Sequence, residues 1–215
     1  MKIVYNGHSS FTLSDGVSVL FDPFKQIGFD MEHQCAEITL CSHSHYDHHA
    51  IDLVDSANII DFEFNGRICS IAISSIKTFH DETNGTKRGE NIVYKVYFNG
   101  KTFVHLGDIG FVDPKVIEFA KNCDVLFVPV GGYYTINHVQ AKEFIDKIKP
   151  QFAIPMHFKT KDCTINISPI DEFLAQFNSY TTHGKTANLC DLKNGVNYFD
   201  FDGDKLAFGF LGGLY

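Results

Sequence analysis

The sequence predicts a layered α/β (α+β) fold, organised as one domain over residues 1–215. Short apolar runs separated by hairpin turns occupy the first half of the chain, and strand-like and helix-like segments alternate in the second half. This combination is typical of packed layers of strands and helices. Because the early hairpins need antiparallel neighbours, two sheets with helices outside fit better than one parallel sheet. No internal repeat and no linker rich in Pro, Gly or Ser divides the chain, which favours one domain.

The first half of the chain is predicted to be almost entirely β-structure. Turns are marked at Asn6-Gly7, Asp15-Gly16 and Asn99-Gly100, because these residues tolerate the positive φ angles of tight hairpins. The expected strands are Lys2–Tyr5, Ser10–Leu13, Val17–Phe21, Glu37–Cys41, Arg67–Ser74, Ile76–Phe79, Asn91–Phe98 and Lys101–Leu106.

The second half is predicted to alternate helices with buried strands. Asp113 is a suitable N-cap for a helix that begins with Pro114. His138–Ile148 has apolar residues at helical spacing and ends before a proline, and Ser168 is a suitable cap for a third helix. The expected helices are Pro114–Lys121, His138–Ile148 and Ser168–Phe177, and the expected strands are Val125–Val130, Phe152–Met156, Val196–Phe201 and Lys205–Phe210.

Composition excludes several classes of protein. Lys and Arg total 18 and Asp and Glu total 26, a net charge of −8, so the chain lacks the positive field that attracts nucleic acid. No apolar stretch reaches the roughly 18 residues of a membrane span, and the N-terminus has the pattern of a strand rather than a signal peptide. The six Cys form no CxxC pair, as in reduced cytosolic proteins. We therefore expect a cytoplasmic protein with a small-molecule substrate and no nucleic-acid or membrane partner, and the 21 Phe could support a homo-oligomer.

The main chemical signal is the pattern H-x-H-x-D-H directly after an expected strand, formed by His43, His45, Asp47 and His48. In extended backbone, residues two apart point to the same side, so His43 and His45 can bind one metal ion. Asp47 and His48 follow where the chain should turn, and can reach a second ion beside it. Imidazole and carboxylate ligands together suit Zn, Mn, Fe or Co.

Three more residues of ligand type also follow expected strands, namely His80, Asp108 and His157. Loops at one end of a sheet converge in space, which is where layered folds build their sites. A lone His after a strand is more often a solvated loop residue, but four separate strand ends that carry such residues are hard to explain in that way. Five His and two Asp make a seven-ligand set, enough for two ions with an open position for water.

Further segments complete a pattern in chain order: Asn6–Ser10, Phe21–Phe24, Phe79-His80, His105–Asp108, Pro129–Gly132 and Ile154–Phe158. Together with the H-x-H-x-D-H loop and the later His, Asp and His, they resemble the metallo-beta-lactamase superfamily. Within it, the chain is most similar to the small single-domain hydrolases that include the ascorbate-6-phosphate lactonase-like proteins. The resemblance extends over about Lys2–Thr160 and is specific for fold and metal site, but not for substrate.

The resemblance implies an αββα sandwich, two mixed β-sheets flanked by helices, with a two-metal site at one edge. Carried over residue by residue, it implies that His43, His45 and His80 hold the first metal, that Asp47, His48 and His157 hold the second, and that Asp108 bridges them. The cofactors would be two divalent ions, Zn by preference, with Mn or Fe as alternatives.

The resemblance and the ligand set imply a metal-dependent hydrolase. A hydroxide that bridges the two ions would attack a small ester, lactone or phosphoester, and Asp47 would both bind metal and orient this nucleophile. The alternative is a non-hydrolytic dinuclear metalloprotein on the same fold, with a redox or regulatory role. Diiron relatives of that kind carry a flavin domain and a carboxylate-rich ligand set, whereas this set is rich in His.

Residues for substrate binding and proton transfer carry weaker signals. His8, in the first turn, is a candidate catalytic acid or hydrogen-bond donor, or else a residue of turn packing. Arg88, beside Lys87 on a loop, could bind an anionic substrate group or be solvated. Tyr133 and Tyr134 follow a buried strand and could form a wall of the pocket, as substrate-binding residues.

Two further residues are expected to have structural roles. Asp22 ends a strand beside Pro23 and is expected to fix the metal loop through hydrogen bonds. His105 lies within a strand, and a core histidine with satisfied hydrogen bonds is expected there more than a residue that orients Asp108.

Overall fold

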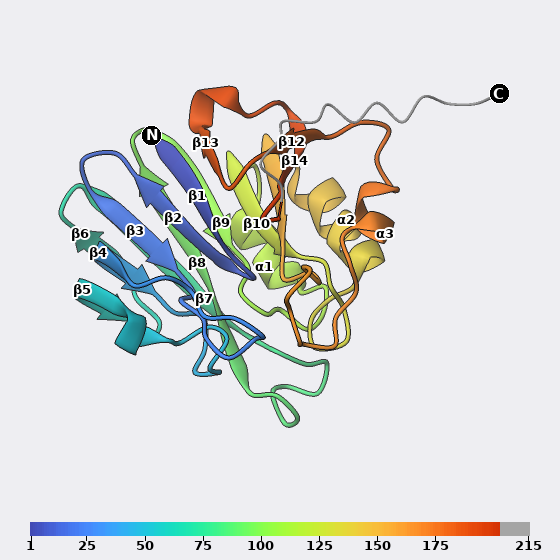
Figure 1. The fold of residues 1–215 in the computed structure, drawn as a ribbon, viewed down its shortest axis with the longest axis horizontal. Coiled ribbons are helices and arrows are strands. Elements are labelled where there is room, and N and C mark those ends of the chain that lie inside the picture. Colours follow the sequence, from blue (N-terminus) through green and yellow to red (C-terminus); the bar gives the residue numbers. More distant parts are fainter. Residues whose placement is uncertain (203–215) are drawn as a thin grey trace.

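The chain, described here by a computed structural model over residues 1–202, has two mixed β-sheets packed face to face at its centre (Figure 1). This confirms the two-sheet architecture expected from the early hairpins and the later buried strands. Among residues 1–202, no helix has the length and apolar character needed to cross a bilayer.

The first sheet has six strands in the order β13-β1-β2-β3-β4-β5. They are β1 (Lys2–Gly7), β2 (Ser10–Ser14), β3 (Ser18–Phe21), β4 (Gln34–Leu40), β5 (Val54–Ile60) and β13 (Thr186–Asn188). β1 is antiparallel to β13 and β2, and β2 to β3, whereas β3, β4 and β5 are parallel. The chain therefore leaves β3 and β4 at the same edge of this sheet.

The second sheet has eight strands in the order β12-β14-β11-β10-β9-β8-β7-β6. They are β6 (Gly66–Ile68), β7 (Ile71–Phe79), β8 (Glu90–Phe98), β9 (Lys101–His105), β10 (Val125–Pro129), β11 (Phe152–Met156), β12 (Thr181–His183) and β14 (Gly195–Phe199). Strands β6 to β9 are antiparallel neighbours, and β9, β10, β11, β14 and β12 are parallel. Because β9, β10 and β11 are parallel, the loops that follow them open at one edge.

Helices cover the outer face of the eight-stranded sheet (Figure 1). They are α1 (Pro114–Ala120), α2 (His138–Ile148) and α3 (Asp171–Leu174), and two short 3₁₀ helices, η1 (Ile51–Leu53) and η2 (Leu189–Asp191), lie elsewhere. The backbone N–H of Lys115 donates to Oδ1 of Asp113 at 2.9 Å, which confirms the predicted cap of α1. The six-stranded sheet has no such helical cover among the described residues; Phe24, Ile27 and Met31 of the loop after β3 pack there instead.

The core between the sheets is aromatic. Phe11 and Phe21 of the first sheet and Phe127 and His105 of the second are fully buried. The ring centroids of Phe11 and Phe127 are 4.5 Å apart, and those of Phe21 and His105 are stacked at 4.9 Å. The ring of His105 also accepts at Nδ1 from the N–H of Gly107 and lies 2.9 Å at Nε2 from the carbonyl of Ser9, so this side chain is a satisfied core histidine, as expected.

The strand break expected between Arg67–Ser74 and Ile76–Phe79 is wrong. The turn lies at Cys69-Ser70, between β6 and β7. Ser74 and Ser75 continue the strand because they pair with β8. Two polar residues in a row therefore suggested a break that strand pairing overrides.

Three observed strands, β5, β12 and β13, were not expected. β5 has polar residues among its apolar ones, and β12 and β13 are three residues each, so none of these three shows a clear strand pattern in the sequence. The expected strand Val196–Phe201 is observed as β14. The expected strand Lys205–Phe210 lies outside the described residues.

The third helix is much shorter than Ser168–Phe177, since only Asp171–Leu174 is α-helical. The backbone N–H of Ser168 donates to the carbonyl of Gly131 at 2.8 Å, and its own carbonyl accepts from Lys159. Ser168 therefore joins two loops instead of capping a helix.

The aromatic contact between the sheets gives a stability prediction. Replacing Phe127 by Ala removes a fully buried ring from the centre of the core, so we expect the free energy of unfolding to fall by roughly 3–5 kcal/mol. The measurement is urea denaturation at a fixed metal concentration. As control, Val139→Ala, at a side chain 58% exposed on α2, should change the value by less than about 0.5 kcal/mol. Equal stability of the two variants would contradict this account of the core.

Candidate metal centre

The predicted ligand residues come together at one edge of the sandwich, although they lie on separate loops. The loop that carries His43 to His48 follows β4 and is held by backbone hydrogen bonds. The N–H of Cys41 donates to the carbonyl of Ile60 at 2.9 Å, and the N–H of Ile92 donates to the carbonyl of Ser42 at 2.9 Å. The loop is thus fixed to β5 on one side and to β8 on the other.

One group of donor atoms belongs to His43, His45 and His80, and these atoms lie within 4.8 Å of one another. The ring centroids of His43 and His45 are 4.5 Å apart, and those of His43 and His80 are 4.9 Å apart. His43 and His45 do face a common point, but the backbone between them is bent and does not form a strand. This group has the same members as the first ligand set that the resemblance implies.

A second group of donor atoms belongs to His8, Asp47, His48 and His157, also within 4.8 Å of one another. It contains the second ligand set that the resemblance implies, with His8 in addition. Nε2 of His8 is 3.3 Å from Oδ2 of Asp47, and the ring centroids of His8 and His157 are 4.3 Å apart. His8 therefore lies inside the cluster and not only in a surface turn.

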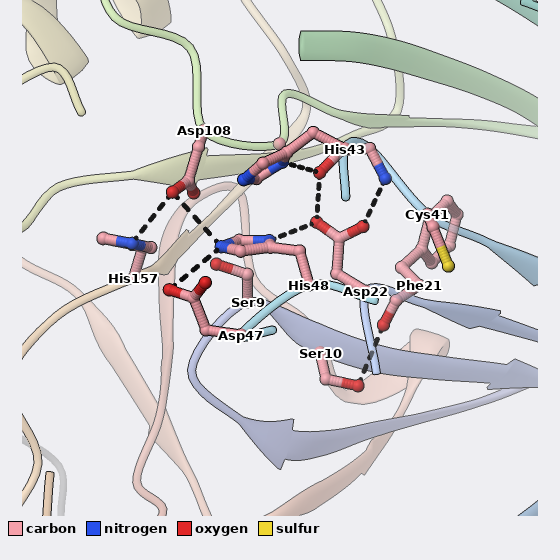
Figure 2. Close-up of polar contacts among 12 residues, drawn as sticks. Ser9, Ser10, Phe21, Asp22, Cys41, His43, Asp47, His48, Asp108 and His157 are labelled. Atoms are coloured by element: carbon pink, nitrogen blue, oxygen red, sulfur yellow. Dashed lines mark hydrogen bonds and ion pairs between the residues drawn. The ribbon is translucent and has the colours of Figure 1, made fainter. Parts of the chain in front are cut away.

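Asp108 lies between the two groups. Its Oδ2 atom is 3.1 Å from Nε2 of His80 in the first group, and 3.2 Å and 3.1 Å from Nε2 of His48 and His157 in the second. Figure 2 shows the contacts with His48 and His157. One carboxylate oxygen thus faces the ring nitrogens of both groups.

The backbone before Asp108 is shaped to allow this position. Gly107 has a φ of +56°, and a Cβ there would lie 2.3 Å from Oδ1 of Asn91. That same oxygen accepts the N–H of Asp108 at 2.9 Å. A larger residue at position 107 would therefore displace the hydrogen bond that holds Asp108.

The buried polar atoms of this cluster suit a metal. Ten buried side-chain N and O atoms in residues 1–202 lack a hydrogen bond of good geometry, and eight of them belong to His8, His43, His48, His80, Asp108 and His157. Each unsatisfied buried polar atom lowers the stability of the fold by about 1–3 kcal/mol. Eight such atoms in one cluster therefore need an explanation. Ligation of divalent ions would satisfy one nitrogen of each ligand imidazole and an oxygen of Asp108.

Charges in the cluster oppose one another. Burial raises the pKa of Asp108, but His157 and His48 lower it well below its usual range. Burial lowers the pKa of His48, but the surrounding carboxylates, Asp108 above all, raise it well above its usual value. Burial, helped by His157, lowers the pKa of His8 to about 4. Imidazole protons therefore balance the carboxylates, and a divalent ion takes over that role when it displaces them.

Asp22 connects the metal loop to the cluster, as expected. Its Oδ1 accepts the N–H of Ser42 at 2.7 Å, and its Oδ2 accepts the Ser42 hydroxyl at 2.8 Å and lies 2.8 Å from Nδ1 of His48 (Figure 2). Asp22 has a φ of 43°, a strained conformation that surrounding contacts must hold. A carboxylate on the far nitrogen of a ligand His fixes the ring and raises its basicity.

A cavity of about 500 Å³ opens beside the ligand residues. It is lined by His45, Tyr46, Asp47, His80, Lys87, Arg88, Asp108, Tyr134, Thr164, Ile165 and Asn166. Arg88 and Tyr134 are thus among the residues that line this cavity. Tyr133 is 66% exposed and is not among the lining residues, although its ring is 4.7 Å from that of Tyr134.

Sequence reasoning did not identify the wall formed by residues 164–166. This segment follows His157, where no familiar motif is present. The N–H of Thr164 donates to the carbonyl of Ile27 at 2.7 Å, so a contact between distant loops places it. No local pattern in the sequence carries that information.

Comparison with known proteins gives consistent matches. A family model described as a beta-lactamase superfamily domain matches residues 2–157. A UPF0173 metal-dependent hydrolase of Carboxydothermus hydrogenoformans is 31% identical over 193 residues, covering 74% of this chain and 85% of that protein. One from Archaeoglobus fulgidus is 30% identical over 195 residues, covering 74% and 84%.

A solved structure is also similar. It is a proposed Zn-dependent hydrolase of the metallo-beta-lactamase superfamily from Thermotoga maritima, with 34% sequence identity and a TM-score of 0.77. The match covers 92% of this chain and 98% of that one.

The Asp22 contacts give a prediction about metal affinity. Asp22→Asn keeps the shape of the side chain but replaces one acceptor oxygen with an N–H₂ group, so either Ser42 or His48 loses its partner. We expect metal affinity to fall by roughly 10- to 100-fold, measured by competition with a chromophoric chelator. Asp55→Asn, at a side chain 76% exposed, is the matched control. An unchanged affinity in Asp22→Asn would show that Asp22 does not support the site.

Proposed function

The chain belongs to the metallo-beta-lactamase superfamily, and on this basis we propose that it is a hydrolase that uses two divalent metal ions to cleave a small ester, lactone or phosphoester. The position of Asp108 carries the proposal, because one of its oxygens faces nitrogens of both donor groups. A carboxylate placed in this way suits a bridge between two ions better than a ligand of one.

The proposed ligand sets follow the two donor groups. The first ion would be held by His43, His45 and His80, the second by Asp47, His48 and His157, with Asp108 shared between them. Three or more nitrogen and carboxylate donors in each set suit Zn, with Mn or Fe as alternatives. When bound, two such ions supply Lewis-acid activation of water and of the bond that is cleaved.

Protein groups around the ligands would orient the reactants. Oδ2 of Asp47 is close to Nε2 of His8, so a proton taken from the attacking water can be shared between them. The lowered pKa of His8, about 4, keeps its ring neutral at pH 7, so that its N–H can donate a hydrogen bond to the carboxylate of Asp47. Tyr134, supported by Tyr133, would form a wall for the substrate.

The alternative of a non-hydrolytic redox or regulatory metalloprotein is less well supported. The relatives described above are named metal-dependent hydrolases, and the donor groups are dominated by His. Similarity to the ascorbate-6-phosphate lactonase-like branch, the cytoplasmic location, the absence of nucleic-acid and membrane partners and a homo-oligomeric state remain predictions from the sequence.

Hydrolysis assays test the proposal. The purified protein is stripped with chelator, reloaded with Zn, Mn or Fe, and assayed on 4-nitrophenyl acetate, γ-butyrolactone and bis(4-nitrophenyl) phosphate. We expect cleavage of at least one substrate class that disappears with chelator and returns with metal. Metal-loaded protein that cleaves none of them, or cleavage that chelator does not affect, would contradict the proposal.

Asp47 gives a sharper prediction. Asp47→Ala removes the carboxylate that orients the attacking water, so kcat should fall by roughly 100-fold or more while KM changes by less than about threefold. Steady-state kinetics at saturating metal measure both. Asp52→Ala, at a side chain 61% exposed and paired with Lys25, should retain wild-type kinetics. Wild-type kcat in Asp47→Ala would exclude the proposed role.

A further inference from the structure

We propose that the substrate of this site carries an anionic group, a carboxylate or a phosphate separate from the bond that is cleaved, and that Arg88 and Lys87 bind it. The inference rests on the proposed function for the cleavage itself. The cavity, the absence of carboxylate partners for the two cations among residues 1–202, and the structure of the loop that carries them support the anion site.

Arg88 and Lys87 are unpaired cations in an acidic protein. Within residues 1–202, six lysines form ion pairs with carboxylates, such as Lys101 with Asp124 at 2.6 Å, whereas others, such as Lys95, lie over an aromatic ring instead. Within residues 1–202, no carboxylate lies within ion-pair distance of Arg88 or Lys87. Both line the cavity beside the ligand residues, and Arg88 is one of only two arginines in the chain.

Contact with Tyr134 holds the guanidinium of Arg88. The guanidinium carbon is 5.4 Å from the centroid of the Tyr134 ring, which lines the same cavity. Such a contact restricts the side chain without using its N–H groups. The planar fork of donors is therefore available to a carboxylate or phosphate, which it can bind through two parallel hydrogen bonds.

The loop that carries both cations is built around the carboxylate of Asp81. Oδ2 of Asp81 accepts the N–H of Lys87 at 3.0 Å and the N–H of Arg88 at 2.8 Å. Its Oδ1 accepts the N–H of Gly85 at 3.0 Å, and both the N–H and the hydroxyl of Thr83 at 2.8 and 2.7 Å. In Figure 1 this loop joins β7 to β8 and extends beyond the sheet.

The ordered backbone of this loop favours a binding site over a pair of solvated surface charges. The N–H of His80 donates to the carbonyl of Gly89 at 3.1 Å, which closes the loop at its base. Asp81, next to the ligand residue His80, then fixes the backbone of both cations relative to the donor groups. A loop with solvated charges needs no such order, since conformational freedom favours the unordered state.

The lining of the cavity narrows the class of substrate. At about 500 Å³, its size suits a small molecule. Its lining combines donor groups and the two cations with Tyr46, Tyr134 and Ile165, which add apolar surface. A compact ester or lactone with one anionic substituent matches these three features.

Three matched 4-nitrophenyl esters and two binding probes test the proposal on metal-loaded protein. The esters are the acetate (neutral), the hydrogen glutarate (carboxylate) and the phosphonoacetate (phosphonate), and the probes for calorimetry are glutarate and methylphosphonate. Arg88→Gln and Lys87→Gln should each weaken binding of at least one anionic probe by about tenfold, with a matching rise in KM for the corresponding ester. KM for the neutral ester should change far less than KM for the anionic ester, and the probe that responds distinguishes carboxylate from phosphate.

Two further variants distinguish the loss of anion binding from a general effect of the substitution on the protein. Arg67→Gln, at the only other arginine and on exposed β6, should bind both probes as the wild type does. Asp81→Asn keeps both cations but turns an amide N–H₂ towards backbone donors, so it should weaken anion binding and leave KM for the neutral ester unchanged. Weaker anion binding with an unchanged KM for the neutral ester would identify Asp81 as a positioning residue.

The outcomes are separable from those of the hydrolase test. Wild-type anion affinity in the double variant Lys87→Gln/Arg88→Gln would overturn the proposal and identify both as solvated loop charges, whether or not esters are cleaved. Anion binding that depends on Arg88 would support the anion site even if no ester in the panel were hydrolysed, and in that case the hydrolase proposal alone would fail.

Discussion

One carboxylate oxygen organises this edge of the protein. Oδ2 of Asp108 lies 3.1–3.2 Å from a ring nitrogen of each of three histidines, His48, His80 and His157. These histidines follow β4, β7 and β11, and Asp108 follows β9, so both sheets contribute to the cluster. The aromatic core fixes how the two sheets pack on each other, and this packing brings the four loops to one place.

The cluster is held by residues that do not themselves face the donor groups. Asp22 fixes both Ser42 and His48, and Asn91 holds the N–H of Asp108. Each of these is a side chain that satisfies backbone N–H groups on a neighbouring loop, which is how a fold can hold several unsatisfied imidazoles close together.

Features with a local cause could be predicted from the sequence. The Asn99-Gly100 turn, the Asp113 cap and the H-x-H-x-D-H loop each depend on residues a few positions apart, and so does the placement of His80 and His157 just after strands. The turn expected at Asn6-Gly7 is wrong by two residues, since Gly7 pairs with Ser10 and the turn lies at His8-Ser9. The role of Asp22 was also expected, because it lies at a strand end beside the metal loop.

Features that depend on distant contacts could not be predicted. β5 is a strand because it pairs with β4, not because its own residues alternate. Ser168 has the sequence of a helix cap, but a hydrogen bond to Gly131 takes its N–H into a loop. The cavity wall at residues 164–166 depends on a contact with Ile27. The sequence predicts His8 either as a catalytic acid or hydrogen-bond donor or as a residue of turn packing, and only the fold shows it beside Asp47 and His157.

Metal content per chain tests the central claim most directly. Protein purified without chelator or nickel affinity resin is analysed by plasma mass spectrometry, for the wild type and for Asp108→Ala. The account predicts about two equivalents of a divalent metal in the wild type and a clear fall in Asp108→Ala, because both donor groups lose their shared carboxylate. A wild type that holds almost no metal even after reconstitution would contradict it.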